Sequence, residues 1–434
     1  MQKNLTQKRL LWILIIVGLL SFACQLPLGQ NTDQGTANTD DLQATIVALQ
    51  TQMVQPEDVQ PTDTGLSGDT ETHNPQVTAT LPADTEQPDQ AEQPGQADQG
   101  TSGYRGFMAH TNQHFVALDF NGVKVGFDAE TSANPWIGEN EVSVFNDQVY
   151  YAQFGENSGV FRVTQQGSQR LDFIDVGTDP ASILVSPDGS MIAWGTSQWI
   201  NNSPETSLYL ANIDGSNQRL VAQIPSTEQV DLWRLYYPYR WTVDGKLVYA
   251  TGLTGIGGYM LFWGYNGMFL YDPASNSSTT LVSEEEHLGI CLSSISDDLQ
   301  KIAITCGDSN QVRVRQLSNG AEVAYPLLPD QGMAGAARFS PSGEWLAYVI
   351  QRAEHDNELG KIVVAPTDGS SAPQVIAEVS NGSFVVEGWA DENTVLVTRN
   401  EFKENSTDIS IWRMNRDGTD AVQVTDGQFI GFIP

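Results

Sequence analysis

The sequence predicts an all-β fold from a four-stranded unit that repeats at intervals of roughly 40 to 55 residues. In each unit, a short apolar segment ends in a turn and is followed at once by a second apolar segment. These first turns lie at residues 144–147, 183–189, 241–245, 295–298, 339–343 and 389–392. Two apolar runs that flank a tight turn are typical of a β-hairpin.

A second hairpin turn follows the first in every unit. The turns lie at 166–167, 212–215, 273–274, 319–320, 366–369 and 415–418. Gly, Asn and Asp recur in them because these residues tolerate the positive backbone φ angles that tight hairpins need. Two hairpins in each unit give six complete units of four strands.

A repeat of this length with four strands predicts a β-propeller, in which each blade covers the apolar face of the next. A seventh blade is split between the two ends of the chain. Residues 432–434 match the end of a first strand at 339–341, and residues 106–110, 114–118 and 123–127 supply the other three strands. We therefore expect a closed seven-bladed ring of antiparallel blades over residues 104–434, with no unpaired edge at the closure.

The best copies of the blade motif contain an aromatic or apolar residue, a Ser-Pro turn and an Ile-Ala or Leu-Ala pair before an aromatic. They lie at 186–194 and 339–348. This motif resembles that of the TolB-like and WD-repeat-like β-propellers across residues 104–434. The resemblance implies the fold and leaves the function open, because this fold carries many functions.

The first 23 residues predict an export signal. Lys3, Lys8 and Arg9 precede an apolar run of fourteen residues at 10–23, which is short for a membrane span of about 20. The segment before Cys24 resembles a bacterial lipoprotein signal, in which this cysteine carries the lipid. Leu20 lies one position further from the cysteine than usual, so a secreted protein or a retained helix stays as an alternative.

Residues 24–103 predict a disordered acidic stalk. From 25 to 103 there are thirteen acidic residues, no Lys or Arg and few apolar side chains to bury. Residues 41–53 are the exception, since Leu42, Ile46, Leu49 and Met53 would share one helical face. This segment predicts a weakly helical piece of stalk or a self-association element; we expect a monomer.

The overall charge makes nucleic acid an improbable partner. The formal net charge is −32, whereas phosphate binding requires clustered Lys and Arg. The stalk carries about thirteen of these charges, and the rest belong mostly to the propeller.

Cys291 and Cys306 fall on consecutive strands of one blade. If Ile295 lies opposite Ile302, an unbroken register places the two cysteines opposite each other. A disulfide or two buried thiols would then be possible in an exported protein. A one-residue change of register would put them on opposite faces.

No catalytic or cofactor motif is recognisable. The five histidines show no metal-ligand spacing, a Gly-x-Ser-x-Gly nucleophile motif is missing, and the acidic run 284–286 is typical of a solvated loop. Asp188 and Asp244 are interpreted as turn formers. We expect no metal and no cofactor, although a pair of carboxylates in the central funnel would suit an enzyme that cleaves an envelope polysaccharide.

An aromatic cluster is the most suggestive binding feature. Its members fall in two neighbouring units, and loops between second and third strands should share a face with the links between blades. The candidate ligand-binding residues are Trp199, Trp233, Arg234, Tyr236, Tyr237, Tyr259, Trp263 and Tyr265. Aromatic side chains with a polar end recur in binding sites. The alternative is that Tyr239 and Trp241 pack between blades and that the other aromatic residues merely cap long loops. Trp194, Trp345, Trp389 and Trp412 should be core residues.

These features predict an exported lipoprotein that presents a propeller outside the cytoplasm. Its expected role is noncatalytic binding of a protein or a glycan at the cell envelope.

Overall fold

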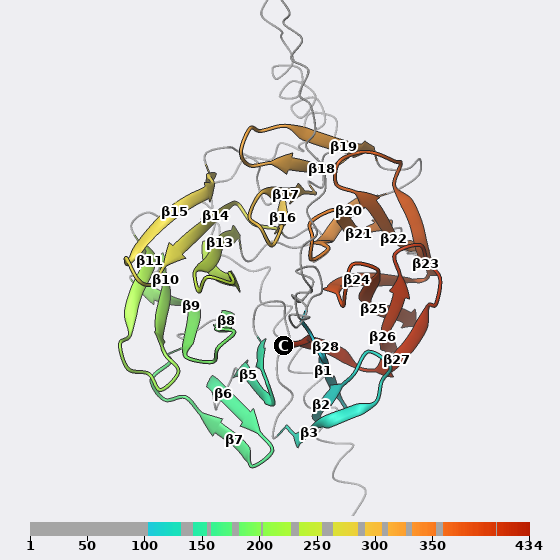
Figure 1. The fold of residues 1–434 in the computed structure, drawn as a ribbon. Coiled ribbons are helices and arrows are strands. Elements are labelled where there is room, and N and C mark those ends of the chain that lie inside the picture. Colours follow the sequence, from blue (N-terminus) through green and yellow to red (C-terminus); the bar gives the residue numbers. More distant parts are fainter. Residues whose placement is uncertain are drawn as a thin grey trace, which may run out of the picture. The chain divides into compact units, whose positions relative to one another are not determined.

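The computed structural model describes residues 103–131, 142–153, 158–175, 182–200, 203–226, 234–253, 264–284, 291–305, 311–326, 332–352, 359–404 and 406–434. The predicted export signal, the segment 41–53 and the predicted stalk, apart from its last residue, lie outside these residues. Within them, twenty-eight strands form seven antiparallel four-stranded sheets arranged as a ring (Figure 1). The predicted seven-bladed propeller is confirmed.

Each blade pairs its strands in a simple meander. Blade 1 contains β28 (Gln428–Ile433), β1 (Gly106–Thr111), β2 (His114–Leu118) and β3 (Lys124–Glu130). Blade 2 contains β4 (Val142–Phe145), β5 (Gln148–Gln153), β6 (Gly159–Thr164) and β7 (Gly167–Arg170). Blade 3 contains β8 (Ser182–Val185), β9 (Met191–Ile200), β10 (Ser203–Asn212) and β11 (Arg219–Ile224). Blade 4 contains β12 (Arg234–Trp241), β13 (Leu247–Leu253), β14 (Gly267–Asp272) and β15 (Ser277–Val282).

The remaining blades follow the same order. Blade 5 contains β16 (Leu292–Ile295), β17 (Lys301–Ile304), β18 (Gln311–Gln316) and β19 (Glu322–Pro326). Blade 6 contains β20 (Met333–Phe339), β21 (Trp345–Arg352), β22 (Leu359–Pro366) and β23 (Gln374–Ser380). Blade 7 contains β24 (Gly382–Trp389), β25 (Thr394–Lys403), β26 (Ser406–Asn415) and β27 (Val422–Asp426).

The turn between the first two strands is held by a hydroxyl and a carboxylate. Ser186 Oγ donates to Asp188 at 2.6 Å, Asp188 also accepts from the Ser190 amide at 3.0 Å, and Gly189 has a φ of 70°. These hydrogen bonds, led by that from Ser186, lower the pKa of Asp188. Asp188 is therefore a turn former, as predicted.

Blade 6 builds the same turn from residues of two blades. Ser342 stands where blade 3 has Asp188, and the missing carboxylate comes from Glu392 of blade 7. The Ser342 amide and Oγ both donate to Glu392, at 2.5 and 2.8 Å. This turn therefore links neighbouring blades as well as neighbouring strands.

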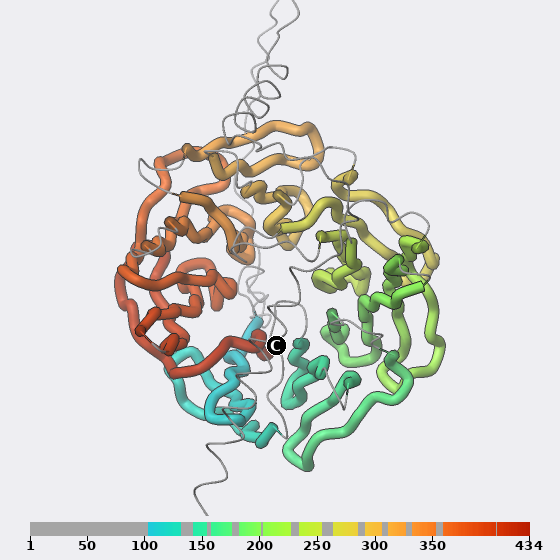
Figure 2. The backbone as a smooth tube through the Cα atoms, turned by 180° about the vertical axis from the view of Figure 1, so that it is seen from behind, coloured from blue at the N-terminus to red at the C-terminus, as the bar shows by residue number. Residues whose placement is uncertain are grey.

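Blade 1 closes the ring by joining the two ends of the chain. In Figure 2 the last strand, red, lies beside the first strand, blue. The register pairs Phe107 with Phe432 and Gly106 with Ile433, and the Arg105 amide donates to the Ile433 carbonyl at 2.9 Å. The split blade predicted from residues 432–434 is confirmed.

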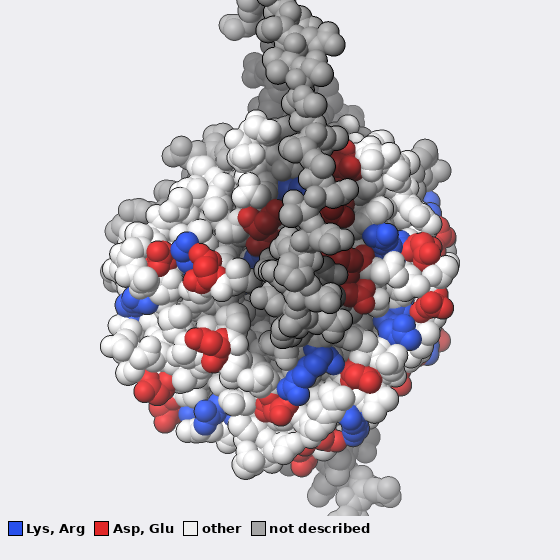
Figure 3. Space-filling view, in the orientation of Figure 1, with Lys and Arg blue, Asp and Glu red and all other residues white. Residues whose placement is uncertain are grey.

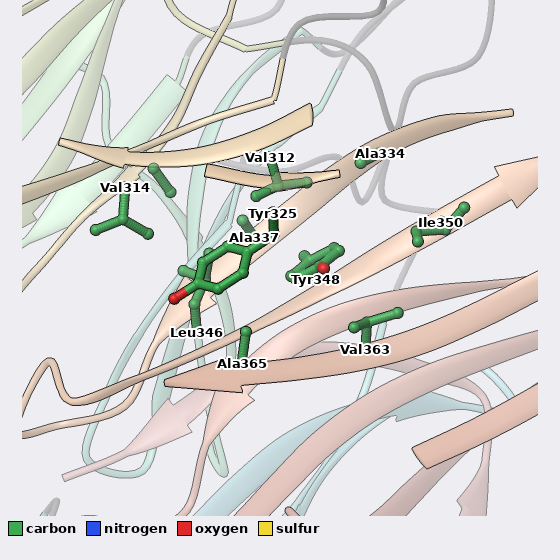
Figure 4. Packing of buried hydrophobic residues seen from close by; sticks show 11 residues of the cluster. Val312, Val314, Tyr325, Ala334, Ala337, Leu346, Tyr348, Ile350, Val363 and Ala365 are labelled. Carbon is green, nitrogen blue, oxygen red and sulfur yellow. The ribbon is translucent and has the colours of Figure 1, made fainter. Parts of the chain in front are cut away.

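The core consists of apolar layers between blades. Between blades 5 and 6, Val312 and Val314 of β18 pack with Leu346 and Tyr348 of β21 (Figure 4). Burial raises the pKa of the Tyr348 hydroxyl. Each sheet thus buries both faces against its neighbours, as a propeller requires.

The four tryptophans expected in the core differ in burial. Trp194 and Trp389 are buried. Trp345 and Trp412 are only partly buried, since each packs on the core with one face and carries an arginine on its ring.

Among the described residues, no helix has the length and apolar character that a membrane span needs.

Candidate functional site

A long hairpin of blade 3 carries an exposed tryptophan. Strands β9 and β10 pair continuously from Met191 with Asn212 to Ile200 with Ser203, whereas β8 pairs with β9 only as far as Gly195. The end of the hairpin therefore extends past the described part of the inner strand, which starts at Ser182. Trp199 lies on this extension with 53% of its surface exposed.

The side of the hairpin that bears Trp199 faces blade 4. Trp199 pairs with Pro204 and Ser197 with Thr206, so these four side chains share one face of the strand pair. Thr206 Oγ1 donates to the carbonyl of Arg234 at 2.8 Å, and Arg234 is the first residue of β12. The fold thus brings Trp199 and Arg234, predicted together, to one side of the hairpin.

Arg234 forms an ion pair within blade 4. Its Nη1 lies 2.6 Å from Oε2 of Glu284, with side-chain exposures of 32% and 26%. Partial burial strengthens such a pair relative to one in open solvent. Because Glu284 follows the outer strand β15, the pair ties the beginning of the inner strand to the end of the outer one. We call Trp199, Arg234 and Glu284 the hairpin site.

Glu284 was not predicted as a site residue. Its acidic run suggested a solvated loop, and the fifty positions between Arg234 and Glu284 carry no sequence signal that the two meet. The pairing follows from the meander, which returns the end of the fourth strand to the end of the blade where the first strand begins.

The candidate tyrosines that the structure describes pack between blades. Tyr236 joins the layer between blades 3 and 4, with its ring centroid 5.9 Å from that of Tyr249. Tyr237 lies on the opposite face of β12, where its ring is 5.8 Å from that of Tyr265. Tyr265 is buried with 7% exposure. Tyr239 and Trp241 also pack between blades, as the alternative interpretation expected. For Tyr236, Tyr237 and Tyr265 this packing differs from both interpretations, which placed them on loops.

Trp233, Tyr259 and Trp263 lie outside the described residues. Their place at the site remains a prediction.

The register beside Cys291 differs from the expected one. Ile295 lies opposite Ile302 as predicted, but an irregularity between Leu292 and Ser294 shifts the pairing by one residue. The Thr305 amide consequently donates to the carbonyl of Cys291 at 2.9 Å. The argument from an unbroken register is therefore wrong. Cys291 is disulfide-bonded, while Cys306 lies outside the described residues, so their pairing stays a prediction.

Many of the described carboxyl groups take part in turns and ion pairs. Those with a shifted pKa are all shifted downward: Asp128, Asp188, Asp214, Asp244, Asp272, Glu322, Asp368 and Asp417. The general acid of a glycosidase needs a raised pKa. Across the described ranges, His, Cys, Asp and Glu also form no group of three that could hold a metal ion.

Charged side chains of both signs are dispersed over the face of the ring seen in Figure 3. Lys and Arg lie among Asp and Glu there and form no continuous basic area in the described part of that face.

No protein-family model matches the chain, and no curated protein matches it. Among solved structures, a putative TolB from Agrobacterium tumefaciens is 14% identical, with a TM-score of 0.32, and the match covers 77% of this chain and 94% of that one. The β-propeller domain of Myceliophteria thermophila Cps50 (Swd1) is 11% identical over 65% of this chain and 84% of that one, with a TM-score of 0.39.

An oligogalacturonate lyase in complex with manganese is 11% identical, with a TM-score of 0.44, and the match covers 65% of this chain and 76% of that one. The neighbours thus include TolB and WD-repeat propellers as well as an enzyme. By its own strand topology, the chain is a seven-bladed β-propeller.

Proposed function

We propose that this chain is an exported lipoprotein whose propeller is a noncatalytic binding module for a protein or glycan at the cell envelope. Lipid on Cys24 would hold it at the membrane, and residues 24–103 would act as the tether. A flexible chain of about 80 residues separates its ends by roughly 50 Å, which would let the propeller reach a partner away from the anchor.

The hairpin site carries this proposal. Trp199 is more than half exposed on a pair of hydrogen-bonded strands, so little conformational freedom is lost when a ligand covers its ring. The ion pair of Arg234 and Glu284 supplies polar groups beside the same face. Tryptophan and arginine are enriched among the residues that dominate binding energy at protein interfaces, and the indole face also suits the apolar side of a sugar ring.

The binding role is tested by screening the full-length protein on a glycan array and against envelope proteins, with Trp199→Ala beside it. For the ligand that binds most tightly in this screen, Trp199→Ala should weaken the affinity about tenfold or more, as expected for the loss of a central aromatic side chain. The matched control is Leu220→Ala, because Leu220 is also exposed, at 46%, on the outer strand of the same blade. Equal binding by both variants and the unaltered protein would refute a role for the hairpin site.

The anchor has its own test. Cys24→Ser should move the protein from the membrane fraction to the soluble fraction after export. Retention in the membrane would show that the apolar segment 10–23, rather than a lipid, holds the chain.

A further inference from the structure

A small pocket opens between blades 6 and 7. It lies at the end of the blades where the first strand turns into the second and the third strand turns into the fourth. The hairpin site lies at the opposite end, where second and third strands are joined. The pocket has a volume of about 120 Å³ and is lined chiefly by Trp345, Val364, Pro366, Ser371, Gln374 and Arg416. Val364 and Pro366 are buried, whereas Ser371 and Gln374 are exposed at its mouth.

The neighbouring interface between blades 5 and 6 has a hydrogen-bonded contact at this position. Lys301 begins the second strand of blade 5 and donates through Nζ to Thr367 Oγ1 of blade 6 at 2.9 Å and to the Gly343 carbonyl at 2.8 Å. One blade further on, the equivalents of Lys301 and Thr367 are Trp345 and Arg416. The Arg416 guanidinium carbon lies 4.3 Å from the centroid of the Trp345 ring. The hydrogen-bonded contact is thus replaced by a stacked pair.

Arg416 also differs from the other arginines that stack on aromatic rings. Arg219, above Tyr271, donates to the Pro273 carbonyl at 2.9 Å, and Arg399, above Trp412, is paired with Glu401 at 2.5 Å. Within the described residues, the Arg416 side chain has neither a hydrogen bond nor an ion pair. Its planar set of N–H donors is held by the indole and left available at the pocket.

An acidic residue, Asp417, also lines the pocket, but its carboxylate is already hydrogen-bonded within the turn. Asp417 accepts from the amide and the hydroxyl of Thr419, at 2.9 and 2.6 Å. The hydroxyl bond contributes most to its lowered pKa, and the charge of Arg416 contributes least. Asp417 therefore matches the turn-forming Asp368 of blade 6, which accepts from the Ser370 amide in the same way. The guanidinium is the feature peculiar to this pocket.

The size and lining of the pocket define the ligand class. A cavity of about 150 Å³ holds benzene, which has six non-hydrogen atoms, so the smaller volume of about 120 Å³ suits a group of roughly five. A stacked guanidinium binds a carboxylate through two parallel hydrogen bonds. Val364 and Pro366 offer an apolar wall for one or two carbon atoms next to it.

We propose that the pocket between blades 6 and 7 binds a carboxylate on a short apolar carbon chain, with Arg416 as its anchor and Trp345 as the support that orients the guanidinium. Two sources share this chemistry: a small free acid and the carboxy-terminal residue of a peptide. The site is independent of the hairpin site, since no residue belongs to both.

The test is isothermal titration calorimetry on the full-length protein. Propionate and N-acetylalanine serve as probes for the two sources, and propionamide and N-acetylalaninamide are their uncharged counterparts. At least one acid should bind while its amide does not, because only the carboxylate can accept both guanidinium bonds. Tighter binding of propionate would identify a free acid as the ligand, and tighter binding of N-acetylalanine a peptide terminus.

Three variants complete the test. Arg416→Gln should weaken the acid about tenfold or more, the loss expected for a hydrogen-bonded charge. Trp345→Phe keeps an aromatic face and should lose only a few-fold. Arg219→Gln removes an arginine stacked on another ring and should bind like the unaltered protein, with thermal unfolding as the check that all three are folded. Equal binding of acid and amide, unchanged binding by Arg416→Gln, or no binding of either acid would overturn the proposal.

Discussion

The side chain of Ile433 should decide whether the ring stays closed. Ile433 is the last residue of β28 and is 0% exposed. It packs with Met108, Phe115 and Phe127 of the other strands of blade 1 and with Val149 of blade 2. Ile433→Ala would therefore leave a cavity lined by two blades at the closure.

The cost can be worked out from this burial. Truncating a fully buried isoleucine to alanine costs about 2 to 5 kcal/mol in free energy of unfolding. We expect about 3 kcal/mol, because the surrounding side chains come from four different strands and cannot all move into the space, while the chain end can adjust. For a domain of about 330 residues, this corresponds to a fall of about 4 °C in Tm.

The assay is thermal unfolding by calorimetry at a fixed scan rate. Val422→Ala is the control, because Val422 is 45% exposed on an outer strand of the adjacent blade and its truncation should change the free energy by less than about 0.5 kcal/mol. Hydrogen exchange of the β1 amides should accelerate in Ile433→Ala alone. If the two variants have the same Tm, β28 does not contribute to closure and the reasoning fails.

Three further outcomes follow from contacts described above. Deleting residues 428–434 should expose the edge of β1 and make the chain aggregate or become protease-sensitive; a truncated chain that resists trypsin like the full one would contradict closure by β28. Ser342→Asp should lower Tm, since two carboxylates would meet at the turn, and adding Glu392→Gln should restore it; additive effects would show that the two residues do not interact. The pKa of His110 is lowered by burial and, to a smaller extent, by His114. As pH falls below about 6.5, the ordinary histidine value, the unfolded chain therefore takes up a proton at this residue more readily than the folded protein, and stability should fall. Above that pH the histidine is neutral in the folded and the unfolded protein, so Tm measured from pH 7.5 to 5 should fall less in His110→Phe.

The turns made the fold predictable. A Ser-Pro-Asp-Gly turn such as 186–189 forms its hydrogen bonds within five residues, so local sequence determines it. The apolar segments on either side of the turn are then recognised as strands from their length and from the alternation of their side chains. Even the split blade could be inferred, because its parts keep the pattern of a complete one.

Contacts between blades were less predictable. The candidate tyrosines were expected on a loop face, yet β12 begins at Arg234, so Tyr236 and Tyr237 alternate between two inter-blade layers. The irregularity near Leu292 shifted the strand register by one residue, and no composition signal marks it. Arg416 and Trp345 lie seventy-one positions apart and meet only because one blade is stacked on the next.

The closure also determines how the ring would bear a mechanical load. The described chain enters at residue 103, two residues before Arg105 donates to the last strand, and β1 lies between β28 and β2. A pull on the amino-terminal segment would therefore be shared by two ladders of hydrogen bonds, one of them the seam itself. If the propeller is tethered through this segment, tension from a bound partner would act first on blade 1. The strength of the pairing between β1 and β28 would then limit the force that the propeller can bear.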